Sequence, residues 1–158
     1  MSANLFDAGW TNITNTDYSS VVIEAMRAKN ASRQGMAWMT MDMMALTFDE
    51  KSFDCVIDKA AMDAIMCDEG DVWSPGMENI TQADAMCTGV SKVLKDDGIF
   101  LQVSFAQPHF RKKYLNGTHA RQAGIGRGHY NWEIETKEVA GQTFPHFLYV
   151  MRRRCCQL

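Results

Sequence analysis

The sequence predicts an α/β fold, a doubly wound sheet that is mostly parallel and ends in an antiparallel hairpin. Short runs of β-forming residues alternate with helical segments along most of the chain, and three of these runs end at an aspartate. Near the end, two strand-like runs follow each other without a helix between them, which is typical of a hairpin. A chain of 158 residues has the length of one domain.

The individual elements follow from hydrophobic period and from capping residues. Residues 1–8 read as a short helix that stops at Gly9, and residues 11–17 are rich in β-formers. Residues 20–29 place apolar side chains on one helical stripe, and Ser19 or Ser20 is a natural N-cap. Further strands are expected at 36–42, 53–58, 99–104, 132–135 and 144–151, and further helices at 80–94 and 109–115, with a loop at 116–128.

Composition excludes several classes of protein. The net charge is -3 and the acidic excess lies in the first half of the chain, so a general nucleic-acid binder is disfavoured. No apolar run approaches the length needed to cross a bilayer, so we expect no membrane partner. The five cysteines show no C-x-x-C spacing, which argues against a disulfide framework and against a metal site. We therefore expect a cytoplasmic protein with free thiols.

Three acids fall where three expected strands end, namely Asp17, Asp42 and Asp58. In an open α/β sheet the ligand lies across the carboxyl ends of the strands. Asp17 could accept both hydroxyls of a ribose, and the ring of Tyr18 could lie on the nucleoside. Asp42 could bind the exocyclic amine of adenine while the backbone amide of Met43 meets a ring nitrogen. Any one of these acids alone is more often a turn or helix-capping residue, but three in register favour an adenosine site.

Several segments carry a resemblance to a known family: residues 12–23, 41–48, 52–63, 108–111 and 147–151. Together they closely resemble class I S-adenosylmethionine-dependent methyltransferases related to the elongation factor 1-alpha lysine methyltransferases. The resemblance implies a seven-stranded methyltransferase fold with S-adenosylmethionine as cofactor. It implies that Asp17 and Tyr18 lie at the ribose and adenine, that Asp42 and Met43 lie at the adenine, and that Lys59 is near the cofactor.

The chain departs from this family at two places. Ala60 and Ala61 stand where relatives commonly carry Gly-Thr. The family also opens with a strand and a glycine-rich turn, and this chain starts after them, so we expect one methyltransferase domain over 1–158 that lacks its first strand. That strand would sit between those ending at Asp17 and Asp58. The glycines of 124–128 do not replace the turn, because they follow no apolar strand and open no helix.

The family's reaction is an in-line displacement at a sulfonium methyl, so the protein mainly aligns the reactants and presents the acceptor unprotonated. The resemblance implies a lysine amine of a protein as acceptor, such as that of a translation elongation factor. Asp58 could orient this amine, and His109 could take a proton near neutral pH. The alternative for His109 is a helix-start residue on a surface loop.

Two other functions compete with methyl transfer. A nicotinamide-dependent oxidoreductase shares the ribose-binding acid, but it would need a glycine-rich fingerprint about twenty residues before Asp17. A non-catalytic methyltransferase-like module would keep the sheet as an interaction surface, and the missing glycine turn supports that alternative.

Overall fold

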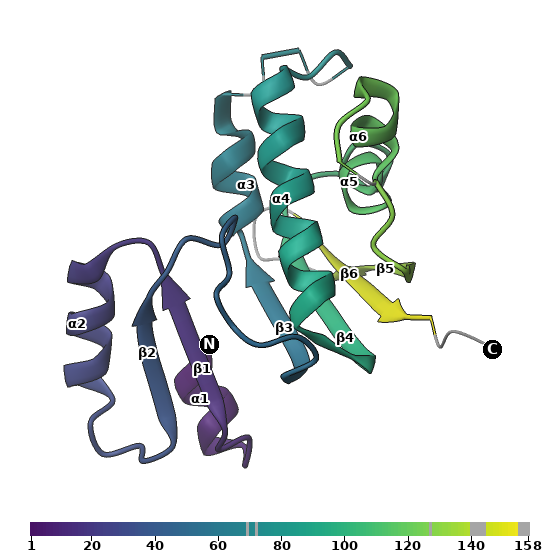
Figure 1. The fold of residues 1–158 in the computed structure, drawn as a ribbon. Helices are drawn as coiled ribbons and strands as arrows, with labels where there is room; N and C mark the ends of the chain where they lie inside the picture. Colours follow the sequence, from purple (N-terminus) through teal and green to yellow (C-terminus); the bar gives the residue numbers. More distant parts are fainter. Residues whose placement is uncertain (69, 72, 127, 140–144, 155–158) are drawn as a thin grey trace. The chain divides into compact units, whose positions relative to one another are not determined.

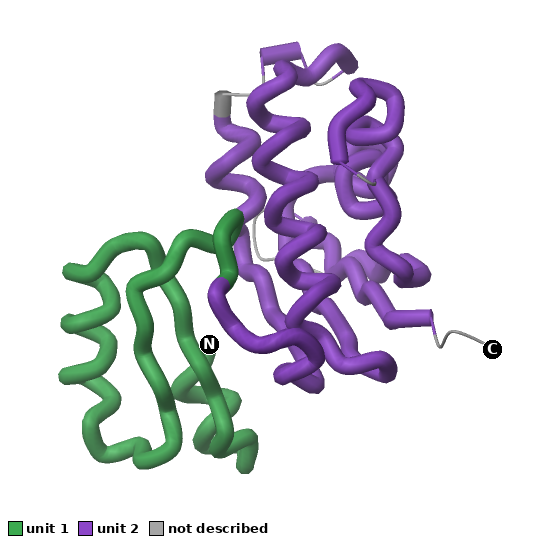
Figure 2. The backbone as a smooth tube through the Cα atoms, in the orientation of Figure 1, with its two compact units in different colours: residues 1–46 green, residues 47–158 purple. Residues whose placement is uncertain are grey.

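The structure is a computed structural model that describes residues 1–68, 70, 71, 73–126, 128–139 and 145–154. The chain divides into two compact units, residues 1–46 and residues 47–158 (Figure 2). Each unit has its own sheet and its own helices (Figure 1). They are described one after the other.

The first unit is a β-α-β element preceded by a short helix. It contains α1 (Ser2–Asp7), β1 (Ile13–Asp17), α2 (Ser20–Lys29) and β2 (Met36–Thr40). The two strands pair in parallel, with Asp17 opposite Thr40 at their carboxyl ends. The Oγ atom of Ser19 accepts a hydrogen bond from the Val22 amide at 3.4 Å, so Ser19 is the N-cap of α2, one of the two serines expected for that role.

The second unit has a four-stranded sheet in the order β3-β4-β6-β5. β3 and β4 are parallel, whereas β6 is antiparallel to both of its neighbours. The last strand of the chain, β6, therefore lies between β4 and β5, and β5 is at the edge of the sheet. The elements are β3 (Phe53–Lys59), α3 (Ala61–Ile65), the 3-10 helix η1 (Met66–Asp68), α4 (Met77–Val93), β4 (Leu94–Ser104), α5 (Pro108–Leu115), α6 (Thr118–Ala123), β5 (Trp132–Val139) and β6 (His146–Arg153).

The core of the second unit forms between α4 and the sheet (Figure 1). Along β4 the side chains alternate, so that Phe100, Gln102 and Ser104 are all buried on one face. Their antiparallel partners on β6 include Tyr149 and Met151, which are fully buried. The buried face of α4 is the one predicted from helical period; its apolar members are Ile80, Ala83, Met86, Cys87, Val90 and Val93.

The α/β class, the parallel strands and the closing antiparallel hairpin are confirmed. The prediction of a continuous loop at 116–128 is wrong, because this stretch contains α6. The side chain of Asn116 accepts hydrogen bonds from the amide and the hydroxyl of Thr118 at 2.9 and 2.7 Å, which starts the turn. Gly117 and Gly124 flank the helix with φ of +72° and +68°, a left-handed conformation that glycine adopts readily. Residue 144, the expected start of the last strand, lies outside the described residues, and β6 begins at His146.

No strand pairing joins the two sheets among the described residues, so β1 and β3, like β2 and β5, each have one unpaired edge. These are the strands between which the sequence analysis expects a missing strand. The organisation of 1–158 as one domain stays a prediction. Within the described part of the chain, no helix is both long and apolar enough to cross a membrane.

Candidate functional site

The parallel pairing of β1 and β2 brings two of the predicted residues to one edge of the first unit. Asp17 is the last residue of β1, and its carbonyl accepts a hydrogen bond from the Met41 amide at 2.9 Å. Asp42 is the next residue after Met41. Because carboxyl ends of parallel strands meet at the same edge, both carboxylates lie where an α/β sheet binds its ligands.

Each of these two carboxylates also supports its own turn. The Oδ1 atom of Asp17 accepts from the Ser19 amide at 2.9 Å, and Oδ1 of Asp42 accepts from the Met44 amide at 2.8 Å. In the described residues, the second oxygen of each carboxylate has no hydrogen bond. The capping role and a ligand role are therefore compatible. Beside them, the side chain of Tyr18 is 85% exposed, and Met43 is half-buried.

Asp58 lies near the end of β3 in the second unit and is only 5% exposed. Its Oδ1 atom accepts from the Ala61 amide at 2.8 Å, and Oδ2 accepts from Gln102 Nε2 at 2.8 Å and from the Met62 amide at 3.3 Å. Burial raises the pKa of the Asp58 carboxyl, and these three hydrogen bonds oppose the rise. The carboxylate thus supports the first turn of α3, and its predicted role toward an acceptor amine stays a prediction.

The turn after β3 has an unusual backbone. Lys59, the predicted cofactor-binding residue, ends the strand with an exposed side chain. Ala60 follows with φ of +64°, in the left-handed region that disfavours residues with a Cβ atom. Its amide donates to the carbonyl of Val103 at 3.1 Å, which ties the turn to β4. Ala60 therefore stands at a position whose backbone conformation favours glycine.

His109, the other predicted catalytic residue, is exposed in the first turn of α5. Its ring centroid lies 3.8 Å from that of Phe110 and 6.1 Å from that of Trp73. Among the described residues it shares no hydrogen bond with Asp58. The structure therefore shows one exposed and one buried candidate, and it does not link them directly.

An ion pair between a partly exposed aspartate and a buried arginine, neither of them a predicted site residue, connects three elements of this unit. The carboxylate of Asp63 on α3 accepts from Arg111 on α5 at 2.6 Å and from the Ser104 hydroxyl at 2.6 Å. The Arg111 side chain is 3% exposed, and its Nε and Nη1 atoms have no hydrogen-bond partner among the residues that the structure describes. Both charged residues stand in the segments that carry the family resemblance, but 48 residues separate them, so no local pattern indicated that they pair.

No group of three or more His, Cys, Asp and Glu side chains in the described part of the chain could hold a metal ion. The residues predicted to bind the cofactor are hydrogen-bond acceptors at strand ends, an exposed tyrosine and one lysine. Such side chains suit hydrogen bonds to the sugar and base of a nucleoside, and this role stays a prediction.

The chain belongs to the methyltransferase-domain family. Residues 1–102 match the family described as "Methyltransferase domain". The chain is 36% identical over 153 residues to the EEF1A lysine methyltransferase 4 of Bos taurus, an alignment that covers 97% of this chain and 56% of the relative. It is 37% identical over 157 residues to the eEF1A lysine and N-terminal methyltransferase of Mus musculus, covering 97% of this chain and 22% of that protein. The chain thus spans about half the length of the Bos taurus relative and about a fifth of the Mus musculus relative.

Solved structures show the same fold. An S-adenosylmethionine-dependent methyltransferase from Methanosarcina mazei matches with a TM-score of 0.63 and 16% identity, covering 97% of this chain and 86% of that one. The N-methyltransferase NodS from Bradyrhizobium japonicum, in complex with S-adenosyl-L-homocysteine, matches with a TM-score of 0.60 and 15% identity, covering 89% and 65%. The prediction of a Rossmann-like methyltransferase fold is confirmed.

Proposed function

We propose that this chain is part of an enzyme that transfers a methyl group from S-adenosylmethionine to a lysine amine of a protein. The observation that carries the proposal is the pair of carboxylates, Asp17 and Asp42, at one edge of the parallel β1-β2 pair. Family membership and the two eukaryotic relatives support the reaction class and the acceptor.

The residues at this edge fit the adenosine part of the cofactor. A ribose offers two hydroxyl donors, and each carboxylate keeps an oxygen that no described donor occupies. The exposed ring of Tyr18 offers an aromatic face to a base. We propose Asp17 and Tyr18 at the ribose and adenine, Asp42 and Met43 at the adenine, and Lys59 near the cofactor.

When bound, the cofactor supplies an electrophilic methyl group on a sulfonium. The protein's own contribution is to hold the acceptor amine in line and to keep it unprotonated. We propose that His109, which is exposed, takes a proton at an imidazole nitrogen. Asp58 is buried and supports the turn before α3, so in this proposal it holds the turn around Lys59 in place and orients the amine through that turn.

These two roles can be separated by kinetics. His109→Gln should lower turnover at neutral pH and change its pH profile, because the imidazole is the proton acceptor. Asp58→Asn should lower turnover without a change of pH profile, because its effect passes through the backbone. Unchanged turnover in either variant removes that residue from the mechanism.

The protein partner and the place of action follow from the same proposal. The relatives are named as methyltransferases of eEF1A, and we propose a translation elongation factor as the substrate of this chain too. Such a substrate places the enzyme in the cytoplasm. Incubation of the protein with the elongation factor and radiolabelled S-adenosylmethionine tests this directly, since label on another protein alone would redirect the assignment.

We further propose that 1–158 works as one domain together with an upstream strand and glycine-rich turn. The unpaired edges of β1 and β3 support this, because exposed strand edges are normally covered. The test is calorimetric binding of S-adenosylhomocysteine by this chain and by a version extended upstream. Binding by the extended version alone supports the proposal; binding by neither supports the non-catalytic alternative.

The cofactor position is tested by Asp17→Asn in whichever version binds. Asparagine keeps an oxygen for the Ser19 amide, so the turn survives while the charge-assisted bonds to the ribose are lost. Affinity should fall by about 1.5 to 3 kcal/mol. The matched control is Glu24→Gln, which removes the same charge from an exposed position on α2. Equal affinity of Asp17→Asn and Glu24→Gln for S-adenosylhomocysteine would mean that Asp17 does not bind the ribose.

A further inference from the structure

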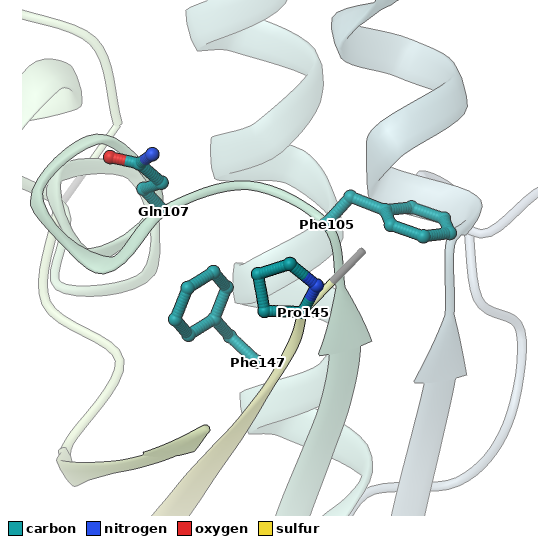
Figure 3. A pocket seen from close by; sticks show the side chains of 4 residues that line it. All are labelled: Phe105, Gln107, Pro145 and Phe147. Carbon is teal, nitrogen blue, oxygen red and sulfur yellow. The ribbon is translucent and has the colours of Figure 1, made fainter. Parts of the chain in front are cut away.

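A cavity of about 390 Å³ lies at the end of β4 and the start of β6, lined by Phe105, Gln107, Pro145 and Phe147 (Figure 3). We call it the Phe147 cavity. In Figure 3 the Phe147 and Pro145 rings lie side by side, the Gln107 amide is on the α5 side, and the Phe105 ring is on the opposite side. None of the site assignments above uses any of these four residues.

The cavity opens at the edge of the sheet where the proposed chemistry lies. Phe147 is paired with Ser104, the last residue of β4, and the preceding residue of β4, Val103, is paired with Lys59 at the end of β3. The parallel strands β3 and β4 thus end beside this cavity. A group held in the cavity therefore lies at the same edge of the second unit's sheet as the turn after Lys59.

The loop that forms one wall of the cavity is held by a network of partly buried hydrogen bonds. The Asp63 carboxylate accepts from the Ser104 hydroxyl at 2.6 Å and from the Phe105 amide at 3.3 Å. The hydroxyl of Tyr149 donates to the Ala106 carbonyl at 2.5 Å, and burial raises the pKa of Tyr149 to about 12, so this donor stays protonated. The ion pair between Asp63 and the buried Arg111 anchors the whole loop.

The network holds the backbone that carries an exposed aromatic side chain. Phe105 is 56% exposed, and its ring centroid is 4.3 Å from that of His146. A rigid loop that exposes a phenyl ring next to an apolar cavity is what a preformed ligand site requires. Loss of side-chain freedom on binding is then small, because the wall is already ordered.

The lining also indicates the kind of ligand. Two phenyl rings and a proline supply apolar surface for a hydrocarbon chain, and the aromatic faces attract a cation. None of the four described lining residues carries a charge, so none of them repels an ammonium group. The side-chain carbonyl of Gln107 at the rim can accept a hydrogen bond from an amine. A hydrocarbon chain that ends in a cation is the chemistry of a lysine side chain.

From these observations we propose that the Phe147 cavity binds the side chain of the acceptor lysine, with its hydrocarbon chain on Pro145 and Phe147 and its amine toward the Gln107 carbonyl. The inference rests on the proposed function, because it assigns a substrate to that reaction. It adds a binding site for the methylated amine, since methyl groups on nitrogen spread the charge and suit an aromatic face.

The test is a titration of the full chain, followed by backbone amide NMR, with three probes. These are Nα-acetyl-Nε-trimethyl-lysine amide, the unmethylated acetyl-lysine amide, and a neutral analogue in which a tert-butyl group replaces the trimethylammonium. We expect shifts centred on Gln107 and Phe147 with both charged probes, and roughly two- to fivefold weaker binding of the neutral analogue. Shifts centred elsewhere, or equal binding of the charged and neutral probes, overturn the proposal.

Variants sharpen the test. Gln107→Glu should tighten and Gln107→Lys should weaken binding of the trimethyl probe, each about fivefold at low salt, while the neutral probe is unaffected. This position is exposed, so both variants should fold. Phe147→Leu keeps apolar volume and removes one of the two aromatic rings, so it should reduce the preference for charged over neutral probe. Trp10→Leu, which removes an exposed aromatic ring outside the cavity, should change nothing. Identical affinities in both Gln107 variants refute the site.

The outcome is independent of the cofactor experiment. If the chain binds S-adenosylhomocysteine but the probes do not shift the cavity amides, the proposed function stands and the acceptor site lies elsewhere. If the probes bind in the cavity and neither chain version binds S-adenosylhomocysteine, the proposed function fails and the cavity binds lysine side chains without catalysis.

Discussion

Replacement of Ala60 by glycine should stabilise the protein. Ala60 has φ of +64°, and the left-handed conformation costs a residue with a Cβ atom about 1 to 2 kcal/mol. Glycine avoids this cost, but it also raises the conformational entropy of the unfolded chain. That increase lowers the free energy of unfolding by about 0.4 to 1 kcal/mol. The free energy of unfolding of Ala60→Gly should therefore rise by about 0.5 to 1 kcal/mol.

Urea unfolding followed by circular dichroism measures this change, with an unchanged m-value as the sign that the unfolded state is comparable. Ala64→Gly is the matched control. It makes the same alanine-to-glycine change at an exposed residue with helical backbone in α3. It should lower the free energy of unfolding by about 0.5 to 1 kcal/mol. If both variants lose stability equally, Ala60 is not left-handed and the account of this turn is wrong.

Three more perturbations test the structure. Asp63→Asn leaves the buried Arg111 without its counter-charge and should cost about 3 kcal/mol in urea unfolding, whereas Asp54→Asn, at an exposed ion pair, should change nothing measurable. Burial raises the pKa of Asp58. As the pH rises from about 4, the carboxyl therefore loses its proton in the unfolded chain before it does so in the folded chain. The contribution of Asp58 to the free energy of unfolding should fall over this range. Asp58→Asn should remove that slope, and an identical slope would contradict the assignment. Ser19→Ala should cost about 1 kcal/mol through loss of the α2 N-cap, and an unchanged midpoint would mean that the 3.4 Å contact contributes nothing.

Local patterns predicted the elements well where the period was strong. The face of α4 could be read from its spacing of Ala83, Met86, Val90 and Val93, because a helix that packs on a sheet must repeat its apolar side chains at that interval. The six-residue helix α6 was missed because it depends on one hydrogen-bonded turn at Asn116 rather than on a hydrophobic period. Short helices carry too few residues to show a period.

The candidate site divides in the same way. Asp17 and Asp42 could be predicted together, since Asp17 ends one strand, Asp42 closely follows the next, and parallel strands align their carboxyl ends. The burial of Asp58 could not, because it depends on Gln102 from the neighbouring strand, 44 residues away. The strand ends were visible in the sequence, whereas the neighbours of each carboxylate were not.

By itself, the sequence determined the α/β class, the succession of the main strands along the chain and the strand ends at which the acids lie, since these follow from period and composition near each residue. Tertiary structure alone decided which acids are exposed, that Asp63 pairs with Arg111, and that Phe105 and Phe147 border one cavity. The physical reason is that these contacts join residues far apart in the chain, and only the register of β4 against β3 and β6 brings them together.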